Sequence, residues 1–220
     1  MTDSAKRIIE IKKLDDQSAI AEFAKNDEND SVSLAALDLI DDQTLLTDIA
    51  RNSIHHEVRR RATRQLEDQS ILEVIAKNDV SHEVRAMAVF LITNQVVLAD
   101  IAKSEEQYQV RATAVERLEN KTLLAEFARN DTNELVRLAA ARALNEQPLF
   151  EDIIQNSTNR FVRQKAIGRI TNKDFLAQLA ENEQNEFVRQ SAKERHDALN
   201  KNEQAKEATS ESTETEKSKP

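Results

Sequence analysis

The chain has 220 residues and a formal net charge of −9, with 31 Lys and Arg, 40 Asp and Glu, no Cys, one Gly and two Pro. The lack of Cys excludes a disulfide scaffold, a thiol nucleophile and Cys-ligated zinc, and the scarcity of Gly and Pro argues against sheets joined by tight turns. The N-terminus is charged too early for a secretory signal, and no apolar run approaches the roughly 20 residues of a membrane helix. We therefore expect a cytoplasmic, all-helical protein with no membrane segment.

Residues 1–15 look like the second half of a repeat that recurs along the rest of the chain. Leu14 falls at the position that Leu66 and Leu118 occupy within their own repeats. We expect 1–15 to form an N-terminal capping half-repeat, because the terminal unit of a stacked array lacks one neighbour.

Seven repeats of 26 residues follow over residues 16–197 without an insertion. Each opens with a polar pair typical of a helix boundary. The pairs are Asp16-Gln17, Asp42-Gln43, Asp68-Gln69, Asn94-Gln95, Asn120-Lys121, Glu146-Gln147 and Asn172-Lys173. Within each repeat, two short apolar patterns with spacings of three and four residues predict two amphipathic helices. Helices this short depend on packing for their stability, so each repeat must stack on its neighbours.

Two recurrent positions predict local structure and, with it, the fold. Position 21 is Ala in every repeat, which indicates that two helices approach closely there. These residues are Ala36, Ala62, Ala88, Ala114, Ala140, Ala166 and Ala192. Position 11 is Asn in all repeats but one, and we expect it to take the left-handed backbone conformation after the first helix. The predicted fold is all-α, a right-handed α-solenoid of stacked antiparallel helix pairs in one continuous domain.

A recurring motif in the second helix resembles a known family. Six repeats carry Val-Arg, followed three residues after the Arg by Ala and then by Leu or Ile. The pairs are Val58-Arg59, Val84-Arg85, Val110-Arg111, Val136-Arg137, Val162-Arg163 and Val188-Arg189. This motif resembles HEAT-like repeats, and the 26-residue period is similar to the phycobilisome-lyase type and, more distantly, to the leucine-rich-repeat variant. The resemblance covers roughly residues 6–197 and implies an α-solenoid, but such arrays serve many unrelated partners.

The repeated Arg of this motif has two alternative roles. It lies six residues after a position that is frequently acidic or carries a hydroxyl, such as Asp79 or Ser53. The Arg can therefore bond the turn of its own or the adjacent repeat, as in the ladders that the resemblance implies. Alternatively, stacked Arg side chains can form a binding ladder for phosphates or carboxylates. We favour the structural role, because recurrence in every repeat is what stacking predicts.

The C-terminal segment, residues 198–220, departs from the repeat. It is polar and rich in Glu, Lys, Ser and Thr. We expect the last helix to run on to about Ala208 and the remaining tail to be disordered, because it has nothing to bury.

No residue pattern of a known enzyme chemistry is present. A Gly-rich phosphate loop is excluded by the single Gly, and there is no Gly-x-Ser-x-Gly motif. His56 and His82 occupy the same position in successive repeats and are expected to be exposed turn residues. We predict no catalytic residue, no metal and no cofactor.

The outward face of the second helices is the candidate binding surface. The Val, Ala and Leu core positions leave positions 16, 19, 20 and 23 of each repeat outward. We predict that five of these residues lie together on one surface: Arg60, Arg61, Arg64, Met87 and Phe90. Leu138 is expected to extend the same face two repeats further on. The large apolar residues at position 16, Leu135, Phe161 and Phe187, either belong to this face or cover the starts of their helices.

These observations favour a non-catalytic protein–protein interaction scaffold, monomeric, that binds a helix or extended segment of a protein partner on this face. One alternative is nucleic-acid binding through the cluster Arg59–Arg64, although the acidic net charge and the lack of an aromatic run argue against it. A second alternative, drawn from the resemblance, is an enzyme of HEAT-like lyase or glycosylase type.

Overall fold

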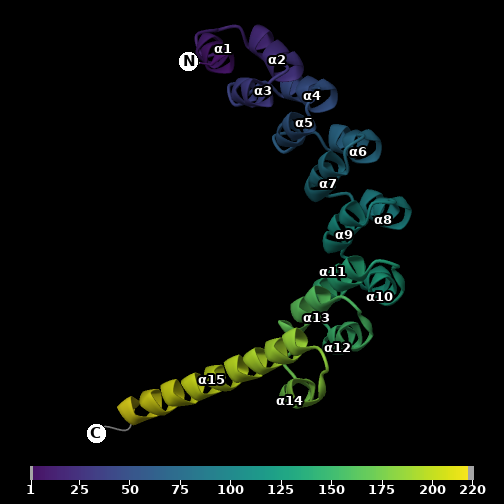
Figure 1. Cartoon of the computed structure of the whole chain (residues 1–220), viewed down its shortest axis with the longest axis vertical. Helices are drawn as coiled ribbons and strands as arrows, with labels where there is room; N and C mark the ends of the chain where they lie inside the picture. Colours follow the sequence, from purple (N-terminus) through teal and green to yellow (C-terminus); the bar gives the residue numbers. More distant parts are fainter. Residues whose placement is uncertain (1, 218–220) are drawn as a thin grey trace. The chain divides into compact units, whose positions relative to one another are not determined.

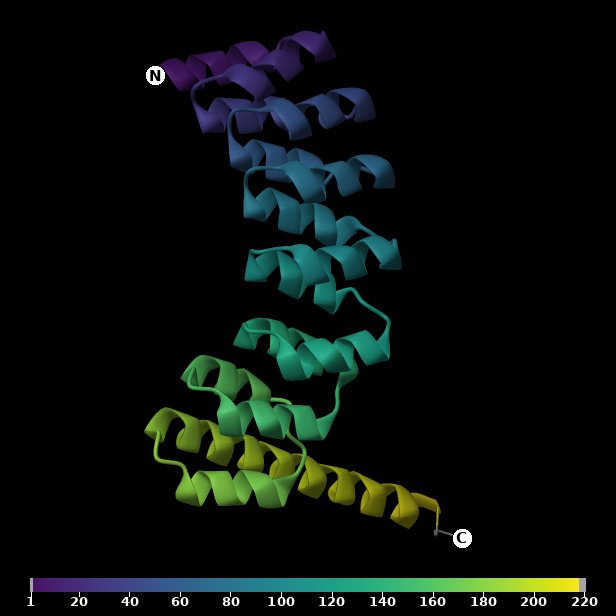
Figure 2. The same ribbon diagram turned by 90° about the vertical axis from the view of Figure 1, so that its right-hand side faces the viewer.

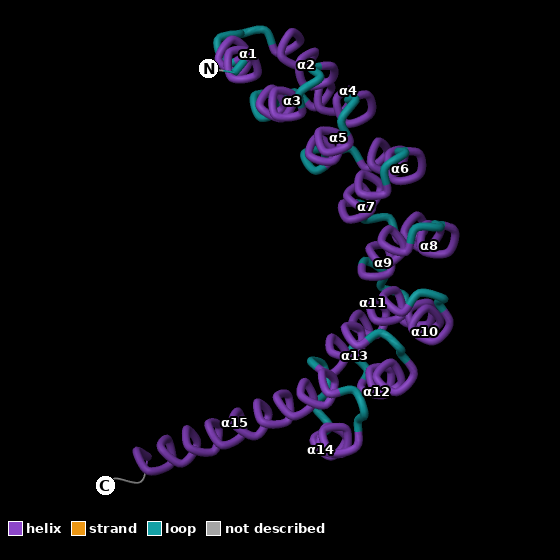
Figure 3. The backbone as a smooth tube through the Cα atoms, in the orientation of Figure 1, coloured by secondary structure: helices purple, strands orange, loops and turns teal. Residues whose placement is uncertain are grey.

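The computed structural model describes the backbone of residues 2–217 and the side chains of residues 2–205. Among these residues all regular structure is α-helical, and the helices are joined by short loops (Figure 3). The helices are α1 (Asp3–Ile11), α2 (Gln17–Asn26), α3 (Asp30–Leu37), α4 (Gln43–Asn52), α5 (His56–Thr63), α6 (Gln69–Asn78), α7 (His82–Leu91), α8 (Gln95–Ser104), α9 (Tyr108–Glu116), α10 (Lys121–Asn130), α11 (Glu134–Leu144), α12 (Gln147–Asn156), α13 (Arg160–Ile167), α14 (Lys173–Asn182) and α15 (Glu186–Lys217). The predicted all-α repeat fold is confirmed.

Contacts divide the chain into two compact units, Met1–Glu119 and Asn120–Pro220, which we call the first and second unit. We had expected one continuous domain. The boundary coincides with the start of a repeat at Asn120. Repeats in such arrays contact mainly their neighbours, so a division is expected to fall between two repeats rather than within one.

The first unit consists of two layers of helices. Helices α1, α3, α5, α7 and α9 form one layer, and α2, α4, α6 and α8 form the other (Figures 1 and 2). Each first helix packs against the second helix of its own repeat, and successive second helices contact one another. Helix α1 packs on α3, which is the place that the second helix of a half-repeat takes.

The second unit has the same alternation. Helix α10 packs against α11, α12 against α13, and α14 against the start of α15. The second helices also contact each other in sequence, α11 with α13 and α13 with α15.

The core of both units lies between the two layers. All seven Ala residues at position 21 are fully buried, from Ala36 in α3 to Ala192 in α15. The largest fully buried side chain is Phe150, in α12 of the second unit. The expectation of close helix packing at position 21 is therefore confirmed.

The starts of the first helices have side-chain caps. The side chain of Asp42 accepts hydrogen bonds from the backbone N–H groups of Thr44 and Leu45, and Asp68 does the same for Ser70 and Ile71. Such caps satisfy amide groups that have no partner within the helix. Each repeat therefore restarts its first helix after the polar residue that opens it, and Glu146 is the exception in making no side-chain cap hydrogen bond.

The role expected for the Asn at position 11 is wrong. These residues are the last of their helices, and Asn145 is the only non-glycine residue with a positive φ among those described. Instead, the side-chain amide of Asn52 donates to the carboxylate of Asp48, and that of Asn156 donates to Asp152. The chain leaves the helix in extended conformation at the next residue, so no left-handed residue is needed.

The expected end of the last helix is also corrected. Helix α15 continues to Lys217, beyond Ala208, where we had expected it to end. Residues 209–217 include Glu and Lys, which are good helix formers, and no Gly or Pro interrupts the chain between Gly168 and Pro220. Residues 218–220 of the expected tail lie outside the described residues.

Candidate functional site

The repeated Arg of the second helix joins neighbouring turns. Nη1 of Arg59 donates to the carbonyl of Ser53, six residues earlier, at 3.0 Å. The same guanidinium donates two hydrogen bonds to the carboxylate of Asp79, twenty residues later, at 2.8 and 3.0 Å. Arg85 repeats this pattern with Asp79 and Glu105. The structural role predicted for these Arg residues is confirmed, because their donors are used within the scaffold.

This ladder also includes the half-repeat. Arg7 stands at the equivalent position and contacts the carboxylate of Asp27. In the first full repeat Ser33 replaces the Arg, and its hydroxyl donates to the carbonyl of Asp27, the same turn that an Arg reaches in other repeats.

The Gln that opens most repeats is a second clamp, which sequence reasoning did not assign. The amide of Gln69 donates to the carbonyl of Leu91 at 3.2 Å and accepts from the backbone N–H of Thr93 at 2.9 Å. Gln43, Gln95 and Gln147 make the same pair of bonds in their repeats. The recurrence of Gln at position 2 of the repeats could have indicated this clamp; Lys121 and Lys173 replace it in two of them.

The layer of second helices in the first unit has an open groove of about 460 Å³ on its surface. Its lining comes from three successive second helices, α5, α7 and α9. The lining residues are Glu57, Arg60, Glu83, Ala86, Met87, Phe90, Thr113 and Glu116. We call this the Phe90 groove. These residues are all at positions 16, 19, 20 or 23 of their repeats, the positions predicted to point outward.

Phe90 is the main apolar element of the groove. Its side chain is 56% exposed, although it belongs to a well-packed helix, and Met87 on the same helix is half-buried. The guanidinium of Arg117 lies 5.6 Å from the centre of the Phe90 ring, which fits a cation–π contact. Phe90 is therefore held against one cation and leaves the rest of its ring open to a ligand.

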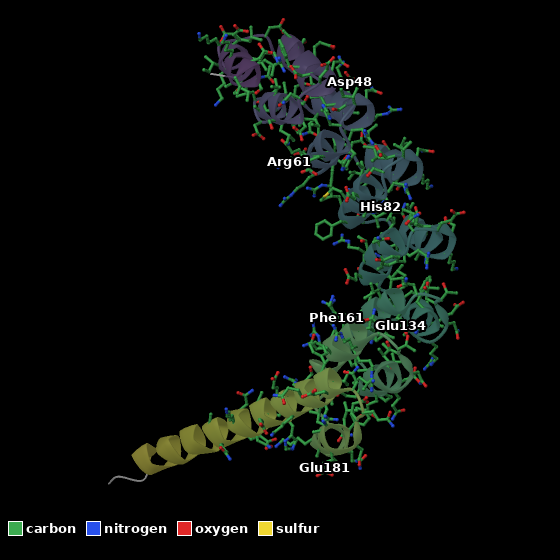
Figure 4. All side chains as sticks on the ribbon, in the orientation of Figure 1. Asp48, Arg61, His82, Glu134, Phe161 and Glu181 are labelled. Atoms are coloured by element: carbon green, nitrogen blue, oxygen red, sulfur yellow. The ribbon has the colours of Figure 1, made fainter. Side chains whose placement is uncertain are left out.

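The predicted Arg residues differ in how far they are engaged. Arg60 donates two hydrogen bonds of 2.8 Å to Glu57, and Arg61 donates a third of 2.9 Å. The hydrogen bonds from Arg60 are the main reason that the pKa of Glu57 falls to about 2. Arg61 lies on the side of the second helices, whereas Asp48 lies on that of the first helices (Figure 4). Arg64, at the end of α5, is exposed.

The structure thus brings Arg60, Met87 and Phe90 into one groove, with Arg61 and Arg64 on the adjoining surface of α5. Leu138 does not join them, and that part of the expectation is wrong. It is 3% exposed and belongs to the core of the second unit. On α11 the buried face is wide, since Ala139, Ala140 and Ala141 are buried as well, and position 19 is covered rather than outward.

A second group of exposed apolar side chains lies in the second unit. Phe161, in α13, is 53% exposed (Figure 4), and Phe187, at the start of α15, is half-buried. Their ring centres are 5.6 Å apart in an edge-to-face arrangement. The guanidinium of Arg160 lies 4.8 Å from one ring centre and 5.3 Å from the other. We call Arg160, Phe161 and Phe187 the Phe161 cluster.

His56 and His82 are the first residues of α5 and α7 rather than turn residues as expected, and two of the His side chains here contact the scaffold. His55 contacts the carbonyl of Asp27 at 2.9 Å, and His56 lies 3.2 Å from the carboxylate of Glu83. His56 is exposed as expected, and His82 is half-buried. Within residues 2–205 no group of three His, Asp or Glu side chains is arranged to hold a metal ion.

Comparison with known proteins finds no family model that matches the chain, and no curated protein or solved structure that matches it. The resemblance to HEAT-like repeats therefore stays a prediction. In the part of the chain that the structure describes, no helix combines the length and the apolar character needed to cross a bilayer.

Proposed function

We propose that this chain is a cytoplasmic, non-catalytic scaffold, and that the Phe90 groove takes an amphipathic segment of a protein partner. The observation that carries the proposal is the exposure of Phe90, 56%, within a groove formed by three stacked helices. An exposed aromatic side chain beside Met and Arg has the composition of the central part of protein interfaces.

Three Glu and one Arg line the groove itself, so acidic residues of a bound segment would lie over the basic edge beside the groove and not inside it. Arg61 and Arg64 are exposed on α5, at the edge next to Arg60. Apolar partner residues would cover Phe90 and Met87, while acidic residues would face this basic edge. Electrostatic complementarity of this kind mainly sets specificity and the rate of association.

The same contacts weigh against nucleic-acid binding through the cluster Arg59–Arg64. Arg59 is buried and bonded to Asp79, and both Arg60 and Arg61 are bonded to Glu57. Phosphate binding needs cations that are free to replace counterions. Three of the four Arg residues already have a carboxylate partner from their own chain.

The proposal can be tested by panning a peptide library displayed on phage against the full chain, followed by fluorescence anisotropy of the selected peptides. We expect amphipathic peptides with acidic residues, whose affinity falls by about 1–3 kcal/mol in Phe90→Ala. The control is Val96→Ala, which removes an apolar side chain that is 70% exposed from α8 in the layer of first helices. Control variants should bind as the wild type does.

Two outcomes would overturn the proposal. One is that selected peptides bind Phe90→Ala as tightly as the wild type while both proteins remain folded by circular dichroism. The other is a gel shift with duplex nucleic acid that weakens steeply as salt rises and is lost when Arg64 is replaced by Gln, which would favour the phosphate-binding alternative.

A further inference from the structure

We propose a second docking site, in the second unit, at which the Phe161 cluster binds a protein segment that carries one carboxylate beside an aromatic or large apolar side chain. It is independent of the Phe90 groove, since it uses other residues on other helices.

The guanidinium of Arg160 is held by aromatic rings rather than by acids. It lies within cation–π distance of both Phe161 and Phe187. Among the described residues, no carboxylate or carbonyl accepts a hydrogen bond from it. Its N–H donors are therefore directed to solvent, while the two rings restrict the plane of the group. A guanidinium presented in this way is suited to bidentate binding of a carboxylate.

Other Arg residues of the chain are bonded to acids or carbonyls of their own scaffold. Arg163, one turn further along α13, donates to the carbonyl of Ile154 and to the carboxylate of Glu183. In the first unit, Arg60 and Arg61 are bonded to Glu57. Arg160 has no such acceptor among the described residues, and it differs from other exposed Arg residues without one, such as Arg64, in its contact with two aromatic rings. Its donors are therefore available to a carboxylate of a partner.

The surface beside Arg160 supplies the apolar half of the site. More than half of Phe161 is exposed, at the second residue of α13. A cap over the helix start would bury this ring, so covering the helix start does not account for it. An open groove of about 620 Å³ adjoins the cluster and is lined by Arg160, Asn185, Glu186, Phe187 and Gln190. The side-chain nitrogen of Asn185 and the side-chain oxygen of Gln190 can bond the backbone of an extended segment, while the other atom of each amide bonds Val188 or Glu194 within the chain.

Glu186 sets a limit on the ligand. Its carboxylate is exposed at the edge of the same groove. A run of acidic residues would be repelled by it, whereas a single carboxylate placed on Arg160 would not have to approach it closely. The charges therefore select an isolated Asp or Glu next to an apolar residue, rather than a polyacidic stretch or a chain of phosphates.

The test is an NMR titration of the isotope-labelled full chain with a capped hexapeptide, Gly-Ser-Asp-Trp-Ser-Gly, and two matched peptides in which Asn replaces Asp or Ser replaces Trp. We expect the first peptide to shift the backbone signals of residues 160–161 and 186–190. Both matched peptides should bind at least roughly fivefold more weakly, since each loses one half of the recognition.

Variants of the chain complete the experiment. Arg160→Gln and Phe161→Ser should each weaken binding of the first peptide by a similar factor, while Phe90→Ala leaves it unchanged. Both positions are exposed, so the variants should keep the wild-type melting curve by circular dichroism. These results are expected even if the Phe90 groove binds no protein partner.

The inference is overturned if the hexapeptide produces no shifts at millimolar concentration, or if the Asn peptide binds as well as the Asp peptide. It is also overturned if a short oligothymidylate shifts the same signals in preference to the peptide. That result would show that the rings and Arg160 serve nucleobases and phosphates instead.

Discussion

The second helices of the two units expose their large apolar side chains at different positions of the same repeat. In the first unit position 16 is polar, with Glu57, Glu83 and Gln109, and the exposed aromatic residue is Phe90 at position 23. In the second unit position 16 is apolar, with Leu135, Phe161 and Phe187, while position 23 is Arg142, Gly168 and Glu194. The buried positions, such as the invariant Ala, do not change. This repeat therefore keeps its core constant, while its surface can place an exposed apolar side chain at either half of the second helix.

The two surfaces also differ in whether their Arg residues are paired with an acidic side chain of the same chain. In the first unit one acid, Glu57, is shared by two Arg residues at the groove, and the exposed ring of Phe90 is contacted by one cation, Arg117. In the second unit Arg160 lies within cation–π distance of two rings and has no acidic partner among the described residues. The first surface therefore relies more on apolar area, and the second on one oriented charge.

The largest effect on the free energy of unfolding is expected when a buried Phe of the second unit is replaced, in comparison with an exposed Phe of the same unit. Phe150→Ala should lower the free energy of unfolding by about 4 kcal/mol, because it leaves a cavity in the core. Phe161→Ala should change it by less than about 0.5 kcal/mol, since that side chain is largely exposed. Urea denaturation followed by circular dichroism measures both. Equal losses would show that Phe161 belongs to the core and not to a surface.

The next effect compares the Arg ladders of the two units. Asp79→Ala should destabilise the first unit by about 3 kcal/mol, because it leaves the buried Arg59 without its carboxylate. Glu183→Ala should cost less in the second unit, since Arg163 and Glu183 are more accessible, at 15% and 13% of the side chain against 10% and 7%. Asp100→Ala, at an exposed position, is the control. If Asp79→Ala changed stability as little as the control does, the Arg ladder would make no contribution to stability.

A smaller effect is expected from the Gln clamp. Gln69→Ala removes two hydrogen bonds that join the start of α6 to the loop after α7 and should cost about 1–2 kcal/mol. Lys121→Ala, at the equivalent position of the second unit, should have almost no effect. Hydrogen exchange of the Thr93 amide reports the clamp directly, and unchanged protection in Gln69→Ala would contradict its role.

The smallest effect is the pH dependence of Glu57. Its pKa is lowered from 4.5 to about 2, so the deprotonated form favours the folded chain. That contribution is complete above about pH 4.5 and is lost as the pH falls through about 2. Because the pair is partly exposed, Glu57→Gln should lower stability at neutral pH by about 1 kcal/mol or less, and the difference from the wild type should vanish at low pH. A difference that persisted at acidic pH would rule out the ion pairs as its origin.

Glu57→Gln also tests the charge comparison, because it leaves Arg60 and Arg61 without their acid and makes the first unit resemble the second. Affinity of the Phe90 groove for acidic peptides should then rise and become more sensitive to salt.

Much of the fold could be predicted from the repeat period, because buried positions such as Ala62 and Val58 recur without exception. The role of the repeated Arg could be predicted for the same reason. Local details that depend on a single alternative hydrogen bond could not be predicted from the sequence. Asn52 was assigned a left-handed conformation, whereas its amide bonds back to Asp48. The helical wheel placed Phe90 correctly but failed for Leu138, because it assumes that every second helix buries a face of the same width.

The uninterrupted 26-residue period has a consequence for how such a chain can change in length. In the ladder steps of Arg59 and Arg85 the guanidinium reaches a turn six residues back and an acid twenty residues ahead, so the donor and its two acceptors keep the same register from one of these repeats to the next. Excision of residues 68–93 would place Glu105 where Asp79 now stands relative to Arg59. The junction would be chemically equivalent to the one it replaces. This repeat can therefore be removed as a unit, and deleting it takes away Met87 and Phe90 while Arg59 keeps a turn and an acid as its acceptors.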